Sequence, residues 1–250
     1  TLMEMIMKKY IFDVDGTLTP SRGVIDPQFK EFFNTFCLMN DVYLVTGSDK
    51  PKTVEQVGTA IYNKCKRVYQ CSGSDVWEGD NNILKSEWIL PIEARHWLEQ
   101  ALDDSNFDIR TGNHIEQRTG MVNFSIVGRN ANAEQRAAYV KSDVSERINL
   151  ATAFNNFFPN LQATVGGETG IDIAPRGADK SQIIRDFDPK DEIHFFGDAM
   201  TLNGNDYPLM KVILDNNLGS CYTVKSWKHT RDKLSLLRPF YEKDNRKVRR

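Results

Sequence analysis

Two acidic residues at positions 13 and 15 are the most suggestive feature of the sequence. Gly16 and Thr17 follow Asp13 and Asp15 at once and allow a tight turn. A calcium loop would need further acids at the next alternate positions, which Thr17 and Thr19 occupy. Two uses of the pair remain. One is a structural turn, and the other is phosphoryl transfer, in which one carboxylate attacks phosphorus and its neighbour carries the proton.

Three further polar positions favour phosphoryl transfer. Thr46 and Asp198 each follow an apolar run typical of a buried strand, and Lys180 begins a predicted helix. Ligands of parallel sheets bind at the carboxyl ends of the strands. A carboxylate that attacks phosphate is opposed by like charge, so it needs a metal ion, a fixed positive charge and hydroxyl donors. Hard oxygen ligands indicate Mg²⁺ on Asp13 and Asp198. Lys180 is then the predicted positive charge, and Thr46 is the predicted hydroxyl donor.

The elements that must position these residues alternate between strand and helix at both ends of the chain. Residues 8–17 and 42–45 are typical of buried strands, and helices are predicted over 26–39 and 51–62. After residue 177 the alternation returns, with a predicted helix and then a strand over 192–196. Parallel neighbours need such long crossover connections. The sequence therefore predicts an α/β fold with a Rossmann-like parallel sheet.

The middle of the chain has a different pattern, typical of an antiparallel sheet with helices. Its predicted elements are a helix from about Pro91, strands at 107–110, 115–118 and 121–126, a helical stretch at 133–158, and strands at 161–165 and 170–174. The core resumes after this segment with a helix predicted over 180–187. We therefore predict a core of residues 1–84 and 178–250, interrupted by an inserted α+β domain of residues 85–177.

Composition argues against several classes of partner. A total of 32 Lys and Arg against 34 Asp and Glu gives a net charge of −2, with no overall field to attract nucleic acid. No apolar run reaches the roughly 20 residues that a membrane-spanning helix needs. The 4 cysteines include no C-x-x-C pair, so they indicate neither a zinc site nor a disulfide framework. We expect a cytoplasmic protein that binds a small molecule, with no nucleic-acid or membrane partner.

Taken in order, the segment 13–17, Thr46, Lys180 and the segment 197–198 resemble the four motifs of the haloacid dehalogenase superfamily. The resemblance implies that Asp13 is the nucleophile and that Asp15 is the general acid and base. It also implies a haloacid dehalogenase-like core in which the inserted domain is a substrate-binding cap.

Residues 115–129 and 166–175 in the predicted cap, and 197–207 in the core, resemble signatures of the eukaryotic-type phosphomannomutases. In that family the cap binds the sugar and the phosphate that is not transferred, helps to form a homodimer and closes over a core that needs Mg²⁺. Arginine suits such a cap because its guanidinium group binds phosphate in a bidentate way. The implied substrate-binding residues are Arg22, Arg118, Asn123, Arg129, Arg136, Thr169 and Asp172, and the implied metal residues are Asp13, Asp15, Asp198 and Asp206.

The implied reaction interconverts mannose 1-phosphate and mannose 6-phosphate through an aspartyl phosphate on Asp13. A hexose 1,6-bisphosphate is the implied activator, and the product feeds GDP-mannose synthesis. Two departures from the family pattern leave a sugar-phosphate phosphatase open, since Gly170 replaces a serine and Thr46 a glycine. A mutase must exclude water from the aspartyl phosphate, whereas a phosphatase must admit it. A binding module that has kept the fold is a third class, against which the intact motifs argue.

Overall fold

The computed structural model describes residues 5–247, with side chains described to residue 237. The chain divides into two compact units. Unit 1 runs through Leu84 and resumes at Asp179, and unit 2 is the contiguous segment Lys85–Ala178. Each unit has its own hydrophobic core, so each is described by itself.

Unit 1 is built on a mainly parallel sheet. Its strands in the described residues are β1 (Lys8–Phe12), β2 (Asp41–Val45), β3 (Arg67–Gln70), β4 (Asp75–Glu78), β5 (Asn81–Lys85), β10 (Glu192–Gly197) and β11 (Gly219–Thr223), in the spatial order β11-β10-β1-β2-β3-β4-β5. The first five strands of this order are parallel, and β4 pairs with β3 in the antiparallel sense. The order places β1 between β10 and β2, so their carboxyl ends meet at one edge.

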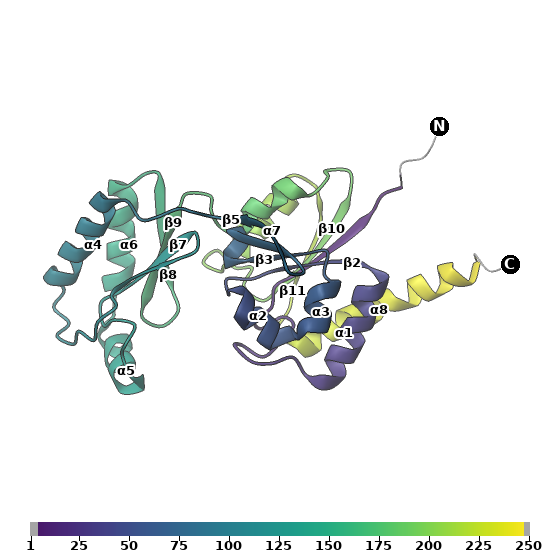
Figure 1. Ribbon diagram of the computed structural model, residues 1–250, viewed down its shortest axis with the longest axis horizontal. Helices are drawn as coiled ribbons and strands as arrows, with labels where there is room; N and C mark the ends of the chain where they lie inside the picture. Colours follow the sequence, from purple (N-terminus) through teal and green to yellow (C-terminus); the bar gives the residue numbers. More distant parts are fainter. Residues whose placement is uncertain (1–4, 248–250) are drawn as a thin grey trace. The chain divides into compact units, whose positions relative to one another are not determined.

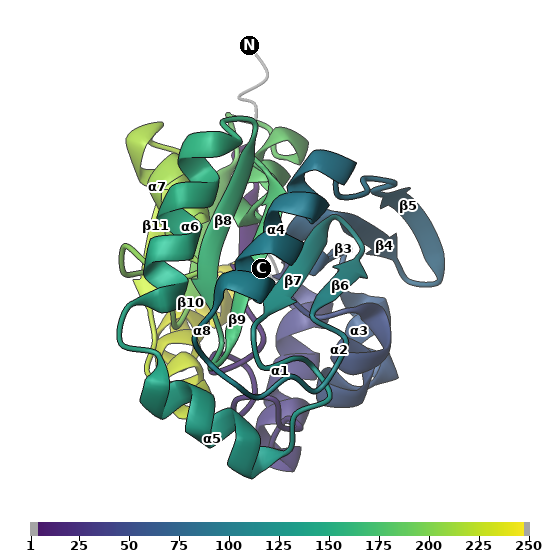
Figure 2. The same ribbon diagram turned by 90° about the vertical axis from the view of Figure 1, so that its left-hand side faces the viewer.

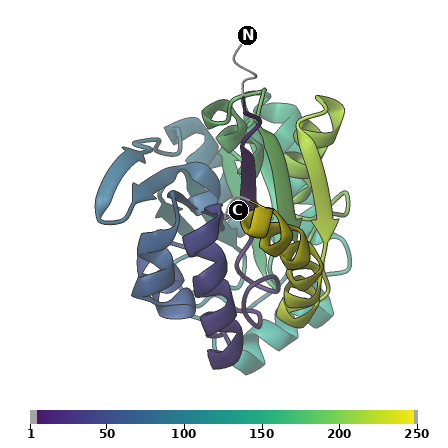
Figure 3. The ribbon, with the colours of Figure 1, turned by 90° about the vertical axis from the view of Figure 1, so that its right-hand side faces the viewer.

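Helices cover both faces of this sheet. Successive side chains of a strand point to opposite faces, and along the central strands the side chains on both faces are apolar. Tyr10 and Phe12 pack on the face of α1 (Pro27–Met39), α3 (Thr59–Lys64) and α8 (Trp227–Lys247). Ile11 packs on the other face, with the 3₁₀ helix η2 (Lys180–Asp186) and α7 (Tyr207–Asp215). Figure 1 shows α7 on one side of the sheet and α1, α3 and α8 on the other. Figure 3 shows α1 and α8 side by side, where Phe29 stacks on Trp227.

Unit 2 is a two-layer α+β structure. Its elements are α4 (Ile92–Asp104), α5 (Ala133–Ser142), α6 (Glu146–Phe157), and an antiparallel sheet of β6 (Ile115–Arg118), β7 (Met121–Ser125), β9 (Gly170–Pro175) and β8 (Leu161–Gly166) in that spatial order. Figure 2 shows α4 and α6 in front of these strands. Phe124 and Ile173 point into the core that these helices share with the sheet. Because side chains alternate along a strand, Asn123 and Asp172 lie on the opposite, polar face.

Several predicted elements differ from those in the structure. The predicted helix over 51–62 is two helices, α2 (Lys50–Val57) and α3, because Gly58 adopts a φ of +83° between them. Residues 107–110 are not a strand, because Arg110 donates to the carbonyls of Leu102, Phe107 and Ile109 in place of a neighbouring strand. Residues 180–186 form a 3₁₀ helix. The prediction had no counterpart for β3, β4, β5 and β11, or for α7 and α8.

No helix within residues 5–247 combines the length and the apolar character needed to cross a membrane.

Candidate active site

Asp13 follows β1 directly and lies at the edge where β10, β1 and β2 end. Its backbone N–H donates to the carbonyl of Phe196 at 2.9 Å, which ties it to β10. Its side chain is 4% exposed, and Oδ2 accepts the hydroxyl of Thr17 at 3.2 Å. A carboxylate so removed from water needs a positive partner.

Lys180 supplies that partner from the first residue of η2. Its Nζ lies 2.7 Å from Oδ1 of Asp13 and 2.7 Å from Oδ1 of Asp206. Its side chain and that of Asp206 are both fully buried. Asp206 is fixed in turn, because its Oδ2 accepts the N–H of Ala199 at 3.0 Å. The structure therefore brings together residues that stand 167 positions apart in the sequence.

A third carboxylate completes a group that suits a hard metal ion. One carboxylate oxygen from each of Asp13, Asp198 and Asp206 lies within 4.8 Å of the others. Two glycines make this close approach possible. A Cβ at Gly16, whose φ is +74°, would lie 2.2 Å from Oδ2 of Asp198, and one at Gly197 would lie 2.6 Å from Oδ2 of Asp206. Three carboxylates face one ammonium, and an all-oxygen set of this kind fits Mg²⁺.

The charges of this cluster are strongly coupled. Burial raises the pKa of Asp13 to about 8, and the negative charges of Asp206 and Asp198 add to the rise, while Lys180 opposes it. Burial alone would lower the pKa of Lys180, but Asp13 and Asp206 outweigh it and raise that pKa. Lys180 is therefore a fixed positive charge, and additional positive charge is what keeps Asp13 ionised.

Asp15 lies beside this cluster and is held by one oxygen. Its Oδ1 accepts the backbone N–H of Arg22 at 2.6 Å and the amide N–H of Gln56 at 2.8 Å. Arg22 itself is exposed and has a φ of +57°, and its contribution here is its backbone and not its guanidinium group.

Thr46 follows β2, as predicted, and is buried. Its hydroxyl accepts the N–H of Ser48 at 3.1 Å, and its backbone is tied to Tyr69 and Ser72. Among the described contacts its hydroxyl has none with the Asp13 carboxylate, so its place at the end of β2 is what connects it with the site.

Two of the predicted sugar-binding residues form a pair on the polar face of unit 2. Nδ2 of Asn123 donates to Oδ1 of Asp172 at 2.8 Å across β7 and β9. Asn123 is 5% exposed, and its Oδ1 has no hydrogen-bond partner. Glycines surround the pair: a Cβ at Gly170 would lie 2.5 Å from Nδ2 of Asn123, and one at Gly166 would lie 2.3 Å from Oδ2 of Asp172. A serine at position 170 would therefore require Asn123 to move. Thr169, next to it, is buried.

The predicted phosphate-binding arginines are only partly brought together. Arg118 and Arg129 both point at Glu116, with Nε to carboxylate distances of 2.5 and 3.8 Å. Arg136 donates instead to the carbonyl of Ala131 at 2.7 Å and makes no described contact with that pair. Burial raises the pKa of Glu116, but Arg118 and its other partners outweigh burial and lower it. Glu116 is thus a permanent anion that aligns two guanidinium groups.

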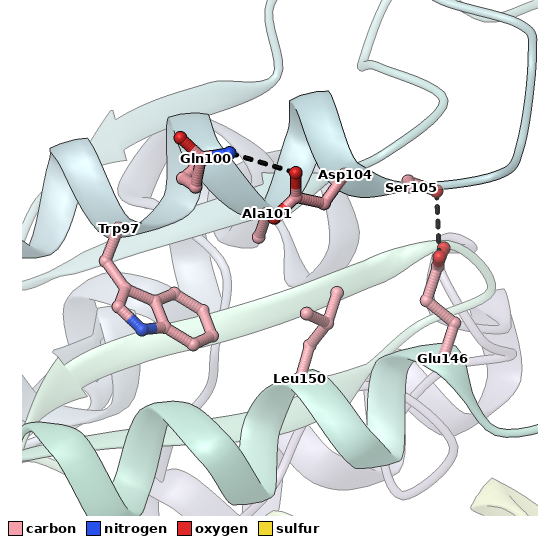
Figure 4. A pocket seen from close by; sticks show the side chains of 7 residues that line it. All are labelled: Trp97, Gln100, Ala101, Asp104, Ser105, Glu146 and Leu150. Atoms are coloured by element: carbon pink, nitrogen blue, oxygen red, sulfur yellow. Dashed lines mark hydrogen bonds between the residues drawn. The ribbon is translucent and has the colours of Figure 1, made fainter.

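A pocket of about 260 Å³ lies between α4 and α6. Figure 4 shows Trp97 from α4 and Leu150 from α6 directed into it, and Ser105 donating to Glu146 at 2.8 Å. Its lining includes none of the predicted site residues.

Comparison with known proteins decides the family. The family model for eukaryotic phosphomannomutase matches residues 29–238. The chain belongs to this family. The phosphomannomutase of Solanum lycopersicum is 32% identical over 248 residues, which cover 94% of this chain and 95% of that one. Phosphomannomutase 1 of Dictyostelium discoideum is 30% identical, over 93% of this chain and 96% of that one. The chain is therefore an enzyme of the phosphomannomutase kind, as the motifs predicted.

Solved structures share the fold. A truncated Plasmodium falciparum IMP-nucleotidase superposes with a TM-score of 0.59 over 92% of this chain and 70% of its own, at 13% identity. A haloacid dehalogenase-like hydrolase from Bacteroides thetaiotaomicron gives 0.52 over 82% and 85%, at 14% identity. These neighbours confirm the predicted haloacid dehalogenase-like core with an inserted α+β domain. Phosphotransferases of that superfamily generally use Mg²⁺, which the carboxylate cluster fits.

Gln56 and Glu116 orient predicted site residues, but neither was itself predicted from the sequence. Gln56 lies on the buried face of α2 with Thr53 and Val57. A long polar residue on the buried face of a helix is a signal that could have singled it out. Glu116 lies between Ile115 and Gln117 in a predicted strand, and nothing in that segment indicates that two arginines converge on it.

Proposed function

We propose that the chain is a Mg²⁺-dependent, cytoplasmic phosphomannomutase that interconverts mannose 1-phosphate and mannose 6-phosphate. A hexose 1,6-bisphosphate activates it by phosphorylating Asp13, and the product feeds GDP-mannose synthesis. The observation that carries the proposal is the contact of Asp13 with Lys180 inside a group of three carboxylates, in a chain of this family.

The first half of the proposed cycle begins with Asp13 phosphorylated, and the free hydroxyl of the sugar monophosphate attacks the phosphorus of the aspartyl phosphate. The new bond joins the sugar oxygen to phosphorus, the bond from phosphorus to the Asp13 oxygen breaks, and Asp15 takes up the hydroxyl proton. The hexose 1,6-bisphosphate that results turns round in the site. In the second half the Asp13 carboxylate attacks its other phosphate, the bond from that phosphorus to the sugar oxygen breaks, and Asp15 gives its proton to the leaving oxygen. The charge on Lys180 stays in contact with Asp13 throughout.

The metal residues of this proposal are Asp13, Asp198 and Asp206, whose oxygens lie together, with the backbone carbonyl of Asp15. When bound, the cation offsets the negative charge of the nucleophile and of the transferring phosphoryl group. Lys180 forms ion pairs with Asp13 and Asp206 and would hold these carboxylates in place with or without a bound cation. Thr46 is proposed to donate its hydroxyl to the phosphoryl group.

Substrate recognition is assigned to unit 2. Arg118, Arg129 and Arg136 are proposed to bind the phosphate that is not transferred, and Arg22 is proposed as a further substrate-binding residue. Support comes from Glu116, which already holds the first two guanidinium groups in place. The hydroxyls of the sugar are assigned to Asn123, Thr169 and Asp172. The free Oδ1 of Asn123 is an acceptor suited to a sugar hydroxyl.

We also propose that unit 2 forms the interface of a homodimer. The supporting observation is exposed apolar surface at α6 and the turn before it, where Val144 is 88%, Ile148 61% and Phe157 68% exposed. Isolated apolar side chains are common on protein surfaces, but neighbouring ones such as Val144 and Ile148, four positions apart, favour association. Light scattering of the purified protein measures the mass, and a monomer at micromolar concentration would refute this part.

The decisive experiment supplies mannose 1-phosphate, glucose 1,6-bisphosphate and Mg²⁺, and follows mannose 6-phosphate and free phosphate together. We expect mannose 6-phosphate to form faster than phosphate is released. Asp13→Asn should abolish turnover, and the exposed Asp188→Asn should leave it unchanged. Release of free phosphate alone would overturn the mutase and leave a sugar-phosphate phosphatase, with Gly170 and Thr46 as the first positions to revert.

A further inference from the structure

Gln56 is a buried polar residue whose position the proposed mechanism does not explain. It stands in the last turn of α2 and is 0% exposed. Its Nε2 donates to Oδ1 of Asp15 at 2.8 Å and lies 3.4 Å from the hydroxyl of Thr19. Its backbone carbonyl accepts the N–H of Ile25 at 2.9 Å. The backbone carbonyl and the amide N–H of Gln56 thus both bind the segment that follows β1.

The other end of the same amide is unsatisfied. Oε1 of Gln56 is buried and has no hydrogen-bond partner. A buried carbonyl oxygen without a donor destabilises a fold, and an apolar residue of similar volume would avoid that cost. Packing therefore does not explain a glutamine at this position. What the amide provides is the N–H that reaches Asp15.

That hydrogen bond makes the two oxygens of Asp15 different from each other. Oδ1 accepts two N–H groups, from Gln56 and from the backbone of Arg22. Within residues 5–237 the structure shows no donor to Oδ2. An oxygen that already accepts two hydrogen bonds is the poorer site for a proton, so the proton belongs on the other one. Rotation of the carboxyl about its χ2 bond would exchange the oxygens, and the two donors oppose it.

We propose that Gln56 is a positioning residue that holds the Asp15 carboxyl so that Oδ2 gives and takes the proton of the sugar hydroxyl. The inference rests on the proposed function, because Asp15 has this task only in phosphoryl transfer. Gln56 does not touch the substrate and acts through Asp15 alone. Its removal affects the steps that need a proton and spares those that do not.

Two phosphate esters distinguish the steps that need a proton from those that do not. A sugar alkoxide is a poor leaving group and departs only when it is protonated, whereas p-nitrophenolate departs without a proton. Gln56→Leu should lower kcat for the conversion of mannose 1-phosphate by about tenfold to a hundredfold, part of what general acid and base catalysis contributes. The KM for mannose 1-phosphate should change by less than about twofold, since Gln56 binds no part of the substrate. The first release of p-nitrophenolate from p-nitrophenyl phosphate, which accompanies the attack of Asp13 and precedes any attack by water, should change in rate by less than about threefold.

Gln70→Leu is the matched control. Gln70 is also 0% exposed, and its amide donates to the carbonyl of Ser48 at 2.8 Å and to the hydroxyl of Thr53 at 2.7 Å. Its substitution removes buried hydrogen bonds beside the same helix without touching Asp15. In Gln70→Leu the rates measured with the two esters should therefore fall by the same factor. Gln56→Glu, which sets a carboxylate against Asp15, should be at least as selective as Gln56→Leu.

The inference is overturned if Gln56→Leu lowers the conversion of mannose 1-phosphate and the release of p-nitrophenolate by the same factor, as the control does. The failure of the proposed function would look different. If the unsubstituted protein releases phosphate from mannose 1-phosphate and forms no mannose 6-phosphate, the mutase is refuted. Phosphate release then serves as the alkyl-ester readout for the same comparison. Absence of turnover with either ester in the unsubstituted protein would refute the function and the inference together.

Discussion

Lys180 offers the sharpest test of how the site is held together. Its ammonium group is buried and lies 2.7 Å from a carboxylate oxygen of Asp13 and 2.7 Å from one of Asp206. Lys180→Met keeps much of the volume and removes the charge. Breaking a buried ion pair by removing one partner costs about 3–5 kcal/mol, because the remaining charge is left uncompensated. With an m value of about 3 kcal/mol/M, the urea midpoint should fall by about 1–1.7 M.

The charge argument also predicts a rescue. In the Lys180→Met background Asp206 is a fully buried carboxylate without a cation, so Asp206→Asn removes an uncompensated charge. The double variant should therefore be more stable than Lys180→Met. In the unsubstituted protein the same Asp206→Asn change breaks an ion pair and should be destabilising. A substitution whose effect changes sign with its background is diagnostic of direct coupling.

The assay is urea denaturation followed by circular dichroism in EDTA, so that no cation replaces the ammonium group. Lys211→Met is the control, since Lys211 is 57% exposed and pairs with Asp215 on one helix. Such surface pairs contribute little to stability, because water and salt screen them. The reasoning is refuted if Lys180→Met costs no more than Lys211→Met, or if Asp206→Asn destabilises both backgrounds equally.

Three further predictions concern other parts of the molecule. Gly16→Ala should raise the Mg²⁺ concentration for half-maximal activity by about tenfold or more, because its Cβ would displace Asp198, whereas Gly177→Ala shares the positive φ but meets no atom within 4 Å and should have little effect. Arg147→Met should speed hydrogen exchange at the turn between β8 and β9, because Arg147 donates to three carbonyls there; unchanged exchange would contradict this. Burial lowers the pKa of His194, so the folded state keeps it neutral while the unfolded state gains a proton. His194 should therefore add nothing to the pH dependence of stability above about pH 6.5 and should destabilise the fold below it. His194→Phe should remove this contribution from urea midpoints measured from pH 7.5 to 5.5.

Much of the site could be predicted from the sequence because its chemistry is concentrated in short segments at strand ends. The positions of Asp13 and Asp198 follow from the pattern of the apolar runs before them, and parallel pairing then brings them together. Lys180 was predicted from its place at the start of a helix and from the need of the carboxylates for a positive charge, although 167 residues separate it from Asp13.

The rest depends on contacts that no local pattern carries. Gln56 contacts Asp15 from 41 residues away, and helical periodicity indicates only that it is buried. The segment 107–110 alternates like a strand, but the guanidinium group of Arg110 donates to its carbonyls at Phe107 and Ile109. Arg118 and Arg129 converge because Glu116 lies between them, which depends on the register of the sheet and on the turn after it.

The division of unit 1 into two sequence segments has a consequence for its synthesis on the ribosome. Strand β1 pairs with β2 on one side, but its other neighbour, β10, begins only at Glu192. Unit 2 is contiguous and can fold as soon as it has emerged, since domains fold as units during translation. At the synthesis rate of about 5–20 residues per second, β1 then waits roughly 10–40 s with one unpaired edge. During that interval the nascent chain exposes an apolar strand that chaperones can bind. Asp13 can meet Lys180 only after the whole of unit 2 has been synthesised.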